Sequence, residues 1–126
     1  MSTDFLTAED KEFLDANYNW GLCEDDTTGM RGVVIHDYCL PAGYTPQKTE
    51  LMLLIPANYP MGNIDMFYFA PRIARADNIG INALADEIHF GIQWQRWSRH
   101  YPWEPGVDSI VTHVGFVANQ LKLELE

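Results

Sequence analysis

Apolar residues recur at helical spacing near both ends of the chain, and strand-like apolar runs fill the region between them. Near the start, Thr7 is placed to cap a helix, and Asp10 can return a bond to the cap from three residues on. The apolar positions around this cap share one helical face: Leu6, Phe13 and Leu14. The pattern therefore predicts a first helix of about three turns that ends near Asn17.

The helical pattern returns near the C-terminus. Asp108 is a favoured N-cap residue type and lies just before the repeat. The residues that repeat at helical spacing are Ile110, Val111, Val114, Val117, Ala118 and Leu121. We expect this final helix to place its apolar face on a sheet.

Four runs between the two helices are predicted to be β-strands. Residues 18–24 form a candidate short strand, which a polar turn cluster at 25–29 follows. Residues 32–40 are rich in β-branched and aromatic side chains and end at a proline. The runs 50–55 and 65–70 are almost continuously apolar and each stops at a proline, which indicates strands buried on both faces. The four runs predict an antiparallel meander of about four strands.

The region between the meander and the last helix shows no clear period. Residues 71–92 contain one turn signal, at Asn78-Ile79-Gly80. Residues 93–106 are rich in aromatic side chains and are predicted to form a long loop. With 126 residues, the chain has the size of one domain spanning residues 1–126. The predicted class is α+β, with a helix at each end, a meander and a long loop.

The net charge of −10 argues against nucleic-acid binding, because phosphate recognition needs a basic face. The charges are unevenly distributed, since acids dominate the N-terminal third and the C-terminal tail. Four of the five arginines fall close together in the sequence: Arg72, Arg75, Arg96 and Arg99. A local basic patch on an acidic body favours a protein partner.

Cys23 and Cys39 are the only cysteines, and we interpret them as reduced, buried small hydrophobes. The N-terminus shows no basic segment followed by an apolar run, so no signal peptide is expected. No apolar stretch approaches the roughly 20 residues that cross a bilayer. We therefore expect a cytoplasmic protein that does not bind membranes.

Residues 51–60 resemble the strand and P-x-x-Y-P turn of ubiquitin-conjugating (UBC) enzymes, with Tyr59 at the turn. Residues 64–71 then stand where the next strand of that fold belongs. Trp103-Glu104-Pro105, ahead of the last helix, is similar to the W-S-P element that follows the active-site loop in UBC enzymes. The resemblance implies a UBC-like α+β fold.

Residues 40–44 and the tryptophan-rich run 93–108 resemble a narrower bacterial branch, the prokaryotic family-E conjugating-enzyme-like proteins. Such proteins are typically encoded beside multi-ubiquitin proteins. The resemblance implies that a ubiquitin-like protein and an activating-enzyme homologue are partners. It also implies a JAB-type peptidase in the same pathway and a role in antiphage defence. No small-molecule cofactor is expected on this subunit, because the activating enzyme would use the nucleotide.

A nucleophilic cysteine is absent at the position where conjugating enzymes carry it. Counting back from Trp103 by the spacing that those enzymes use gives Gln95. No cysteine follows Cys39, and the histidine-proline-asparagine motif is also missing, although His89 lies at a suitable distance upstream. Thioester transfer at the usual position is therefore excluded.

Ser98 is the candidate nucleophile in a first hypothesis, in which it accepts the acyl group as an oxyester. A serine hydroxyl needs a base at neutral pH, and histidine can supply one. His100 shares a face with Ser98 in an extended segment, and His89 could approach from the other side of the loop. Arg96 or Arg99 could hold a developing oxyanion or a carboxylate.

Other interpretations stay open. The protein can be a non-catalytic variant that binds a ubiquitin-like protein, or an enzyme outside ubiquitin chemistry that shares the sheet. Trp94 and Trp97 are either core residues or a platform for a partner. A zinc site at His89, His100 and His113 with neighbouring acids lacks the usual ligand spacing, so no metal is expected. Taken alone, His113 is predicted to be a surface or packing residue of the last helix.

Overall fold

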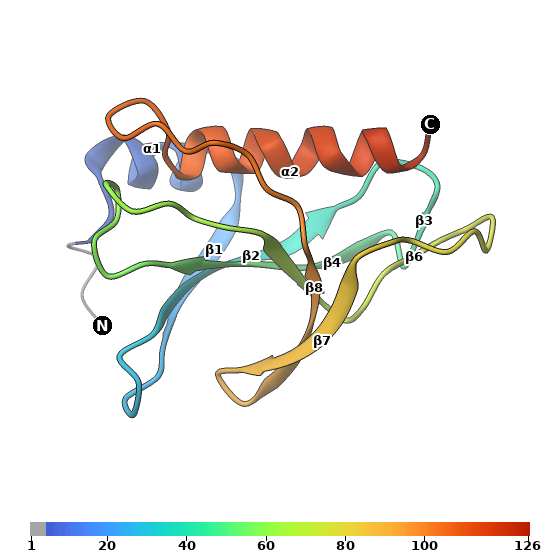
Figure 1. The fold of residues 1–126 in the computed structure, drawn as a ribbon, viewed down its shortest axis with the longest axis horizontal. Helices are drawn as coiled ribbons and strands as arrows, with labels where there is room; N and C mark the ends of the chain where they lie inside the picture. Colours follow the sequence, from blue (N-terminus) through green and yellow to red (C-terminus); the bar gives the residue numbers. More distant parts are fainter. Residues whose placement is uncertain (1–4) are drawn as a thin grey trace.

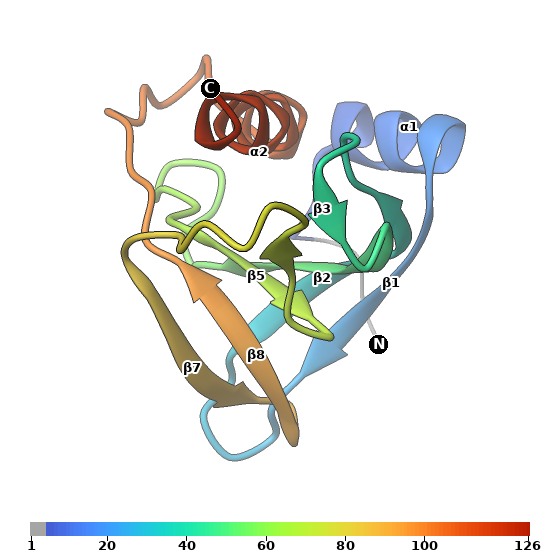
Figure 2. The same ribbon diagram turned by 90° about the vertical axis from the view of Figure 1, so that its right-hand side faces the viewer.

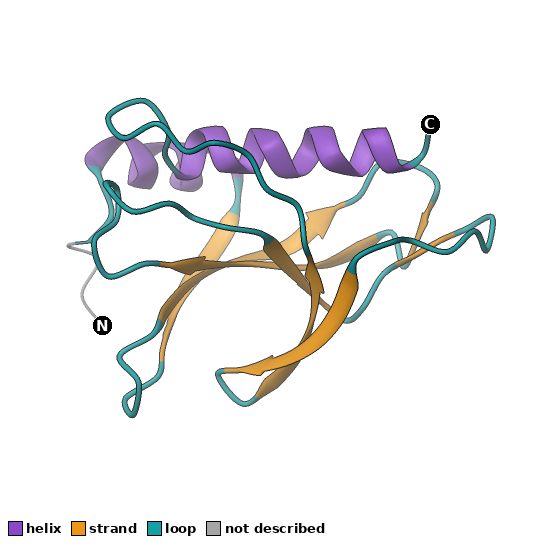
Figure 3. Cartoon of the chain, in the orientation of Figure 1, coloured by secondary structure: helices purple, strands orange, loops and turns teal. Residues whose placement is uncertain are grey.

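The computed structural model describes residues 5–126 and places two helices on one side of an antiparallel sheet (Figure 1). The helices are α1 (Ala8–Asn17) and α2 (Ile110–Glu124). The strands are β1 (Asn19–Glu24), β2 (Arg31–Cys39), β3 (Tyr44–Thr45), β4 (Lys48–Ile55), β5 (Phe67–Ala70), β6 (Ala74–Arg75), β7 (Leu84–His89) and β8 (Ile92–Trp97). A long connection without regular structure leads from β8 to α2 (Figure 3). Over residues 5–126, neither helix is long and apolar enough to cross a membrane.

Six strands form the main sheet in the order β1-β2-β4-β5-β8-β7, and each neighbouring pair is antiparallel. The short strands β3 and β6 pair with each other. The register places Val34, Met52, Tyr68 and Arg96 opposite one another in turn, so their side chains form one row across the sheet. The β7–β8 hairpin curves away from the helices (Figure 2).

Both helices begin at a capping box. The Thr7 hydroxyl accepts the N–H of Asp10 at 3.0 Å, and the Asp10 carboxylate accepts the N–H of Thr7. At α2, Ser109 is the N-cap in place of the expected Asp108. Asp108 instead accepts the N–H of Glu104 in the preceding turn. Both predicted helices are confirmed, and the cap of the second moves by one residue.

The sheet buries apolar side chains on both faces. The larger cluster lies between the sheet and the helices and includes Leu14, Leu53, Phe69, Trp97 and Val117. The smaller cluster lies on the opposite face and comprises Val34, Met52, Tyr68 and Trp94. Because the central strands are covered on both sides, their sequences show continuous apolar runs and little alternation.

The α+β class is confirmed, but the sheet has six strands instead of about four. Residues 93–97, expected at the start of the long loop, belong to β8 and pair with β7 in a hairpin. β7 is an edge strand that contains poor strand formers at residues 85–87. β8 buries Trp94, Gln95 and Trp97 on its two faces, so it also lacks a period of two.

The Gln95 side chain bonds the backbone of Ile73, in the segment between β5 and β7, as a neighbouring strand would. Its Oε1 accepts the N–H of Ile73 at 3.1 Å, and its Nε2 donates to the carbonyl of Ile73 at 2.9 Å. The indole N–H of Trp97 also donates to Gln95 Oε1. The buried amide is therefore satisfied and ties Ile73 to β8.

The cysteines differ from expectation in one respect. Both are free thiols, and Cys23 is half-buried beside the smaller apolar cluster, where burial raises the pKa of its thiol. Cys39 is exposed at the end of β2, so the prediction that both cysteines are buried was wrong for Cys39.

Tyr59 joins the starts of the two helices. Its hydroxyl donates to Asp10 Oδ2 at 2.6 Å and accepts the N–H of Ile110 at 2.8 Å. The Tyr59 ring is buried, and burial raises the pKa of its phenol above the ordinary value. The corner that contains Tyr59 is therefore bonded to both α1 and α2.

Replacing Tyr59 by Phe should lower the free energy of unfolding by about 2 kcal/mol, because the buried Ile110 N–H loses its partner and the buried Asp10 carboxylate loses one of its two. Urea denaturation followed by tryptophan fluorescence measures this loss. Tyr38→Phe is the matched control, since Tyr38 is equally buried and its hydroxyl makes no hydrogen bond within residues 5–126. Equal losses of unfolding free energy in Tyr59→Phe and Tyr38→Phe would contradict the stabilising role of the Tyr59 hydrogen bonds.

Candidate functional site

The end of β8 carries the predicted site residues. Arg96 and Ser98 point to the sheet face opposite the helices, called the far face below, because they alternate with Trp97 of the core. Ser98 is half-buried, and its N–H donates to the carbonyl of Ala83 at 3.1 Å. Ser98 is therefore anchored to the start of β7 at one end of the hairpin.

A chain of polar contacts runs from Ser98 along the far face. Arg96 Nε donates to Ser98 Oγ at 3.1 Å, and the same guanidinium forms an ion pair with Glu87. Glu87 also bonds Nε2 of His89 at 2.8 Å. Three of the predicted residues, Ser98, Arg96 and His89, thus belong to one network. At its centre is Glu87, to which the sequence pattern gives no catalytic role.

His89 reaches Ser98 only through this network. The register pairs His89 with Ile92 next to the hairpin turn, whereas Leu84 pairs with Trp97 at the opposite end. Ser98 lies six residues after Ile92, which corresponds to roughly 20 Å along the backbone of β8. The His89 ring instead packs edge-on against another far-face residue, Tyr68, at a centroid distance of 5.3 Å.

The charges of the far face are set by Glu87. Burial raises the pKa of Glu87, but hydrogen bonds from His89 and Arg96 outweigh that effect, so the pKa lies below its ordinary value. Glu87 is therefore ionised at neutral pH and holds the Arg96 guanidinium by charge. Burial and the nearby Glu87 charge raise the pKa of Tyr68 to about 12, which keeps its phenol neutral.

His100 is paired with a residue that lies 35 positions away in the sequence, Asp65. The His100 Nδ1 lies 2.7 Å from Asp65 Oδ1. Because an ionised carboxylate only accepts, Nδ1 carries the proton, and Nε2 of the neutral ring is free to accept one. No hydrogen bond joins His100 to Ser98. Both members of the Asp65–His100 pair are well exposed, with side-chain exposures of 44% and 59%.

A buried histidine lies beneath this pair. His113 of α2 has no solvent exposure, its Nε2 lies 2.8 Å from the Met66 carbonyl, and its Nδ1 lies 3.0 Å from the Tyr101 hydroxyl. The carbonyl can only accept, so Nε2 carries the proton and Nδ1 accepts from Tyr101. Burial lowers the pKa of His113. It is therefore neutral at physiological pH.

Arg99 donates to the Ser98 carbonyl at 3.3 Å, but neither it nor the two tryptophans bond the Ser98 hydroxyl. Arg99 bonds Glu124 at the end of α2 and stacks over the Trp97 ring at 5.0 Å. Trp97 is fully buried in the core, and Trp94 is 2% exposed on the far face. Neither indole is presented to a partner in this structure, so both tryptophans pack the sheet.

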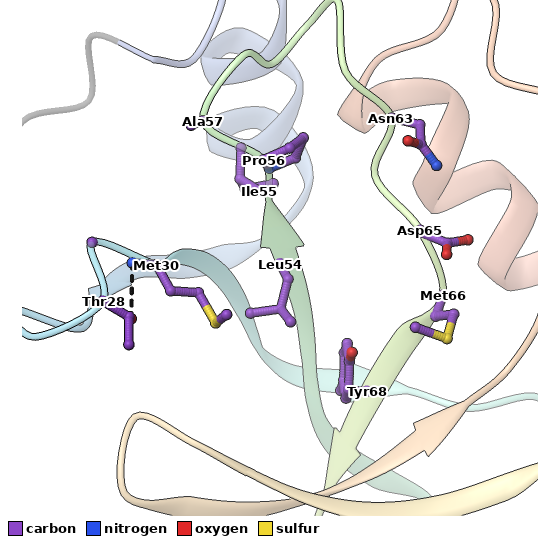
Figure 4. Close-up of a pocket in the computed structure, with 11 residues that line it drawn as sticks. Thr28, Met30, Leu54, Ile55, Pro56, Ala57, Asn63, Asp65, Met66 and Tyr68 are labelled. Carbon is purple, nitrogen blue, oxygen red and sulfur yellow. Dashed lines mark hydrogen bonds between the residues drawn. The ribbon is translucent and has the colours of Figure 1, made fainter.

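A shallow hollow of about 390 Å³ opens beside Asp65 (Figure 4). Its walls include Met30 from the β1–β2 turn, Leu54 and Tyr68 from the sheet, and Met66. Asp65 and Met66 lie on the segment that enters β5 in the same view.

The residues considered for zinc have other partners. His89 bonds Glu87, His100 bonds Asp65, and His113 bonds Met66 and Tyr101 in three separate places. Among residues 5–126, no three histidine, cysteine or acidic side chains are grouped as metal ligands.

These features define a class of protein. A helix precedes an antiparallel sheet, and a C-terminal helix follows a loop whose Trp103 indole donates to the carbonyl of Pro60 at 3.1 Å, next to the Tyr59 corner. This is a UBC-like α+β fold.

The family model for prokaryotic E2 family E matches residues 6–124, and the chain belongs to this family. Membership implies interaction with ubiquitin-like proteins and an activating enzyme. No curated protein and no solved structure matches the chain.

The buried His113 makes stability depend on pH. Its folded-state pKa lies below the unfolded value of about 6.5, so the unfolded chain binds the proton more tightly. Its contribution to stability is complete above pH 6.5 and is lost as the pH falls. Urea unfolding should show that the free energy of unfolding of the wild type falls between pH 7.5 and pH 5.5. In His113→Gln this fall should be smaller by about 1 kcal/mol. A wild-type pH difference in His113→Gln would refute the assignment.

Proposed function

We propose that this protein carries the C-terminal acyl group of a ubiquitin-like protein as an oxyester on Ser98, within a bacterial conjugation pathway. Family membership supports a role in such a pathway. The observation that carries the chemical part is the Asp65–His100 pair, whose histidine lies in the same connection as Ser98 and keeps one imidazole nitrogen free. An orienting acid, a histidine and a hydroxyl are the groups that activate serine in acyl transfer.

The proposed step is a nucleophilic substitution at the activated C-terminal carbonyl. The activating enzyme uses ATP to adenylate the ubiquitin-like protein. Ser98 Oγ then attacks the carbonyl of the adenylated C-terminus, and its proton passes to His100 Nε2. AMP leaves as the new C–O bond forms. After His100 has released that proton to water, an amine of the target attacks the oxyester carbonyl. His100 takes the amine proton and returns it to the serine oxygen as the C–N bond forms and the C–O bond breaks.

Arg96 supports this chemistry from the far face. Its Nε already donates to Ser98 Oγ, so the guanidinium can stabilise negative charge that develops on that oxygen. The ionised Glu87 keeps the guanidinium in place. His100 must approach Ser98 for the proton transfer, and the exposure of the Asp65–His100 pair leaves room for that movement.

A non-catalytic role is the second candidate function. The Ser98 hydroxyl accepts a bond from Arg96 and is bonded to neither His89 nor His100, which favours a structural role for this serine. In that case the protein would bind and present a ubiquitin-like protein or its activating enzyme. A JAB-type peptidase and antiphage defence belong to the same pathway under either proposal.

Incubation with the activating enzyme, ATP and the ubiquitin-like protein should produce an adduct that survives thiol reductants and is cleaved by hydroxylamine. Ser98→Ala should abolish this adduct, because its hydroxyl supplies the acyl acceptor. Asp65→Ala and His100→Gln should slow its formation by about 100-fold, since a positioned base contributes that much or more. Denaturing electrophoresis with mass spectrometry measures the adduct. Arg72→Gln, an exposed arginine outside the network, is the control. An unchanged adduct in Ser98→Ala would remove Ser98 from its role.

Ser98→Cys should convert the adduct to one that thiol reductants release. A thiol ionises near neutral pH and depends less on a base, so His100→Gln should slow the cysteine variant less than the serine protein. The measurement is the ratio of adduct-formation rates without and with His100→Gln, taken once in the serine protein and once in Ser98→Cys. The alternative binding function instead predicts that no adduct forms in either background while binding persists.

A further inference from the structure

His113 connects the two segments that carry Asp65 and His100. Its Nε2–H donates to the Met66 carbonyl and its Nδ1 accepts the Tyr101 hydroxyl. Met66 directly follows Asp65, and Tyr101 directly follows His100. The buried imidazole therefore fixes the chain one residue beyond each member of the exposed pair.

The Asp65–His100 pair needs such support. An exposed hydrogen-bonded pair of side chains contributes little stability, because water competes for the bond and two mobile side chains must be ordered. The β5–β8 pairing of Phe67 with Trp97 brings the two segments together, but so weak a pair cannot by itself fix the orientation of the chain beyond those residues. The two bonds of the fully buried His113 lie in a medium where hydrogen bonds are stronger and costlier to lose.

The backbone at Met66 makes its bond to His113 more important. Met66 has a φ of 59°, in the left-handed region that is unfavourable for non-glycine residues. Such a conformation persists only when surrounding contacts determine it. Release of the Met66 carbonyl would let this residue relax, and the rotation would carry the adjacent Asp65 away from His100.

Tyr101 provides the second anchor. Its ring lies 4.4 Å from the Phe116 ring of α2, centroid to centroid, and its hydroxyl is bonded to His113. Burial raises the pKa of Tyr101 to about 12, so the phenol keeps the proton that it donates. The ring contact places this segment against α2, and the hydroxyl fixes its rotation.

We infer that His113 is a positioning residue that holds the Asp65 carboxylate against the His100 imidazole through Met66 and Tyr101. It thereby determines that Nδ1 of His100 carries the proton and that Nε2 is left free. The inference deepens the proposed function and rests on it for the catalytic consequence. The arrangement of the pair itself rests on the hydrogen bonds.

The test reads the tautomer of His100 by long-range ¹H–¹⁵N correlation at pH 8.5, where an ordinary imidazole is neutral. In the wild type the Nδ1–H form should predominate. Tyr101→Phe removes a single hydroxyl and His113→Leu removes both bonds. Each should shift His100 toward the Nε2–H form, as should Asp65→Ala. Phe116→Leu, which loosens packing around Tyr101 without removing a hydrogen bond, should keep the wild-type tautomer.

Two outcomes overturn the positioning role: a wild-type tautomer in both Tyr101→Phe and His113→Leu, or an equal shift in Phe116→Leu. If His113→Leu does not fold, Tyr101→Phe decides the question. The conjugation assay separates this inference from the proposed function, because oxyester formation in Tyr101→Phe should slow by roughly tenfold while Phe116→Leu keeps its rate. A wild type that forms no oxyester would sink the proposed function, and the spectra would still decide the positioning role.

Discussion

Burial of β8 on both faces determines where the candidate site lies. Trp97 is committed to the core beneath the helices, and Trp94 to the smaller cluster on the far face. Because two large rings fix the rotation of the strand about its axis, Arg96 and Ser98 must lie on the far face of the sheet. The same constraint places Arg96 opposite Tyr68 of β5, and it brings Glu87 of β7 within reach of the Arg96 guanidinium. The far-face network is thus a consequence of core packing.

In the proposed function a hydroxyl takes the role of a thiol, and this changes what the surrounding residues must supply. A cysteine thiol ionises near neutral pH, so an enzyme that uses one can operate with modest help. A serine hydroxyl needs a base to remove its proton and a cation or donor to stabilise the charge that follows. Arg96 at the hydroxyl and the oriented His100 in the same connection match those two needs. The site therefore differs from a thiol site by more than one atom.

Local patterns in the sequence predicted the parts of the fold that depend on neighbours along the chain. The Thr7 cap, both helices and the four strands of the meander all follow from spacing, capping and proline stops. The β7–β8 hairpin could not be predicted this way, because an edge strand with Asp86 and Glu87 lacks strand formers and a strand buried on both faces has no alternation. Its stability comes from tertiary packing that no short window contains.

The residues of the candidate site also differ in whether local sequence patterns could reveal them. Ser98, Arg96 and His100 could be found from the loop that the UBC resemblance identified. Asp65 could not, because its relation to His100 spans 35 residues and no motif links them. His113, predicted as a surface or packing residue, is buried and bonded to residues 12 and 47 positions away. Long-range hydrogen bonds of this kind leave no local pattern.

The Gln95 amide, which binds the N–H and carbonyl of Ile73, has a consequence for how the molecule opens. The Gln95 side chain bonds the Ile73 backbone as a neighbouring strand would. It thereby fastens to β8 a segment that is also held by the bond from Thr49 to the Pro71 carbonyl and by the pairing of β6 with β3. The Ile73 amide should therefore exchange its hydrogen as slowly as the interior of β8. Local opening of this segment would then require that β8 itself be disturbed. The segment between β5 and β7 and the strand that carries Arg96 and Ser98 are, on the timescale of hydrogen exchange, one cooperative unit.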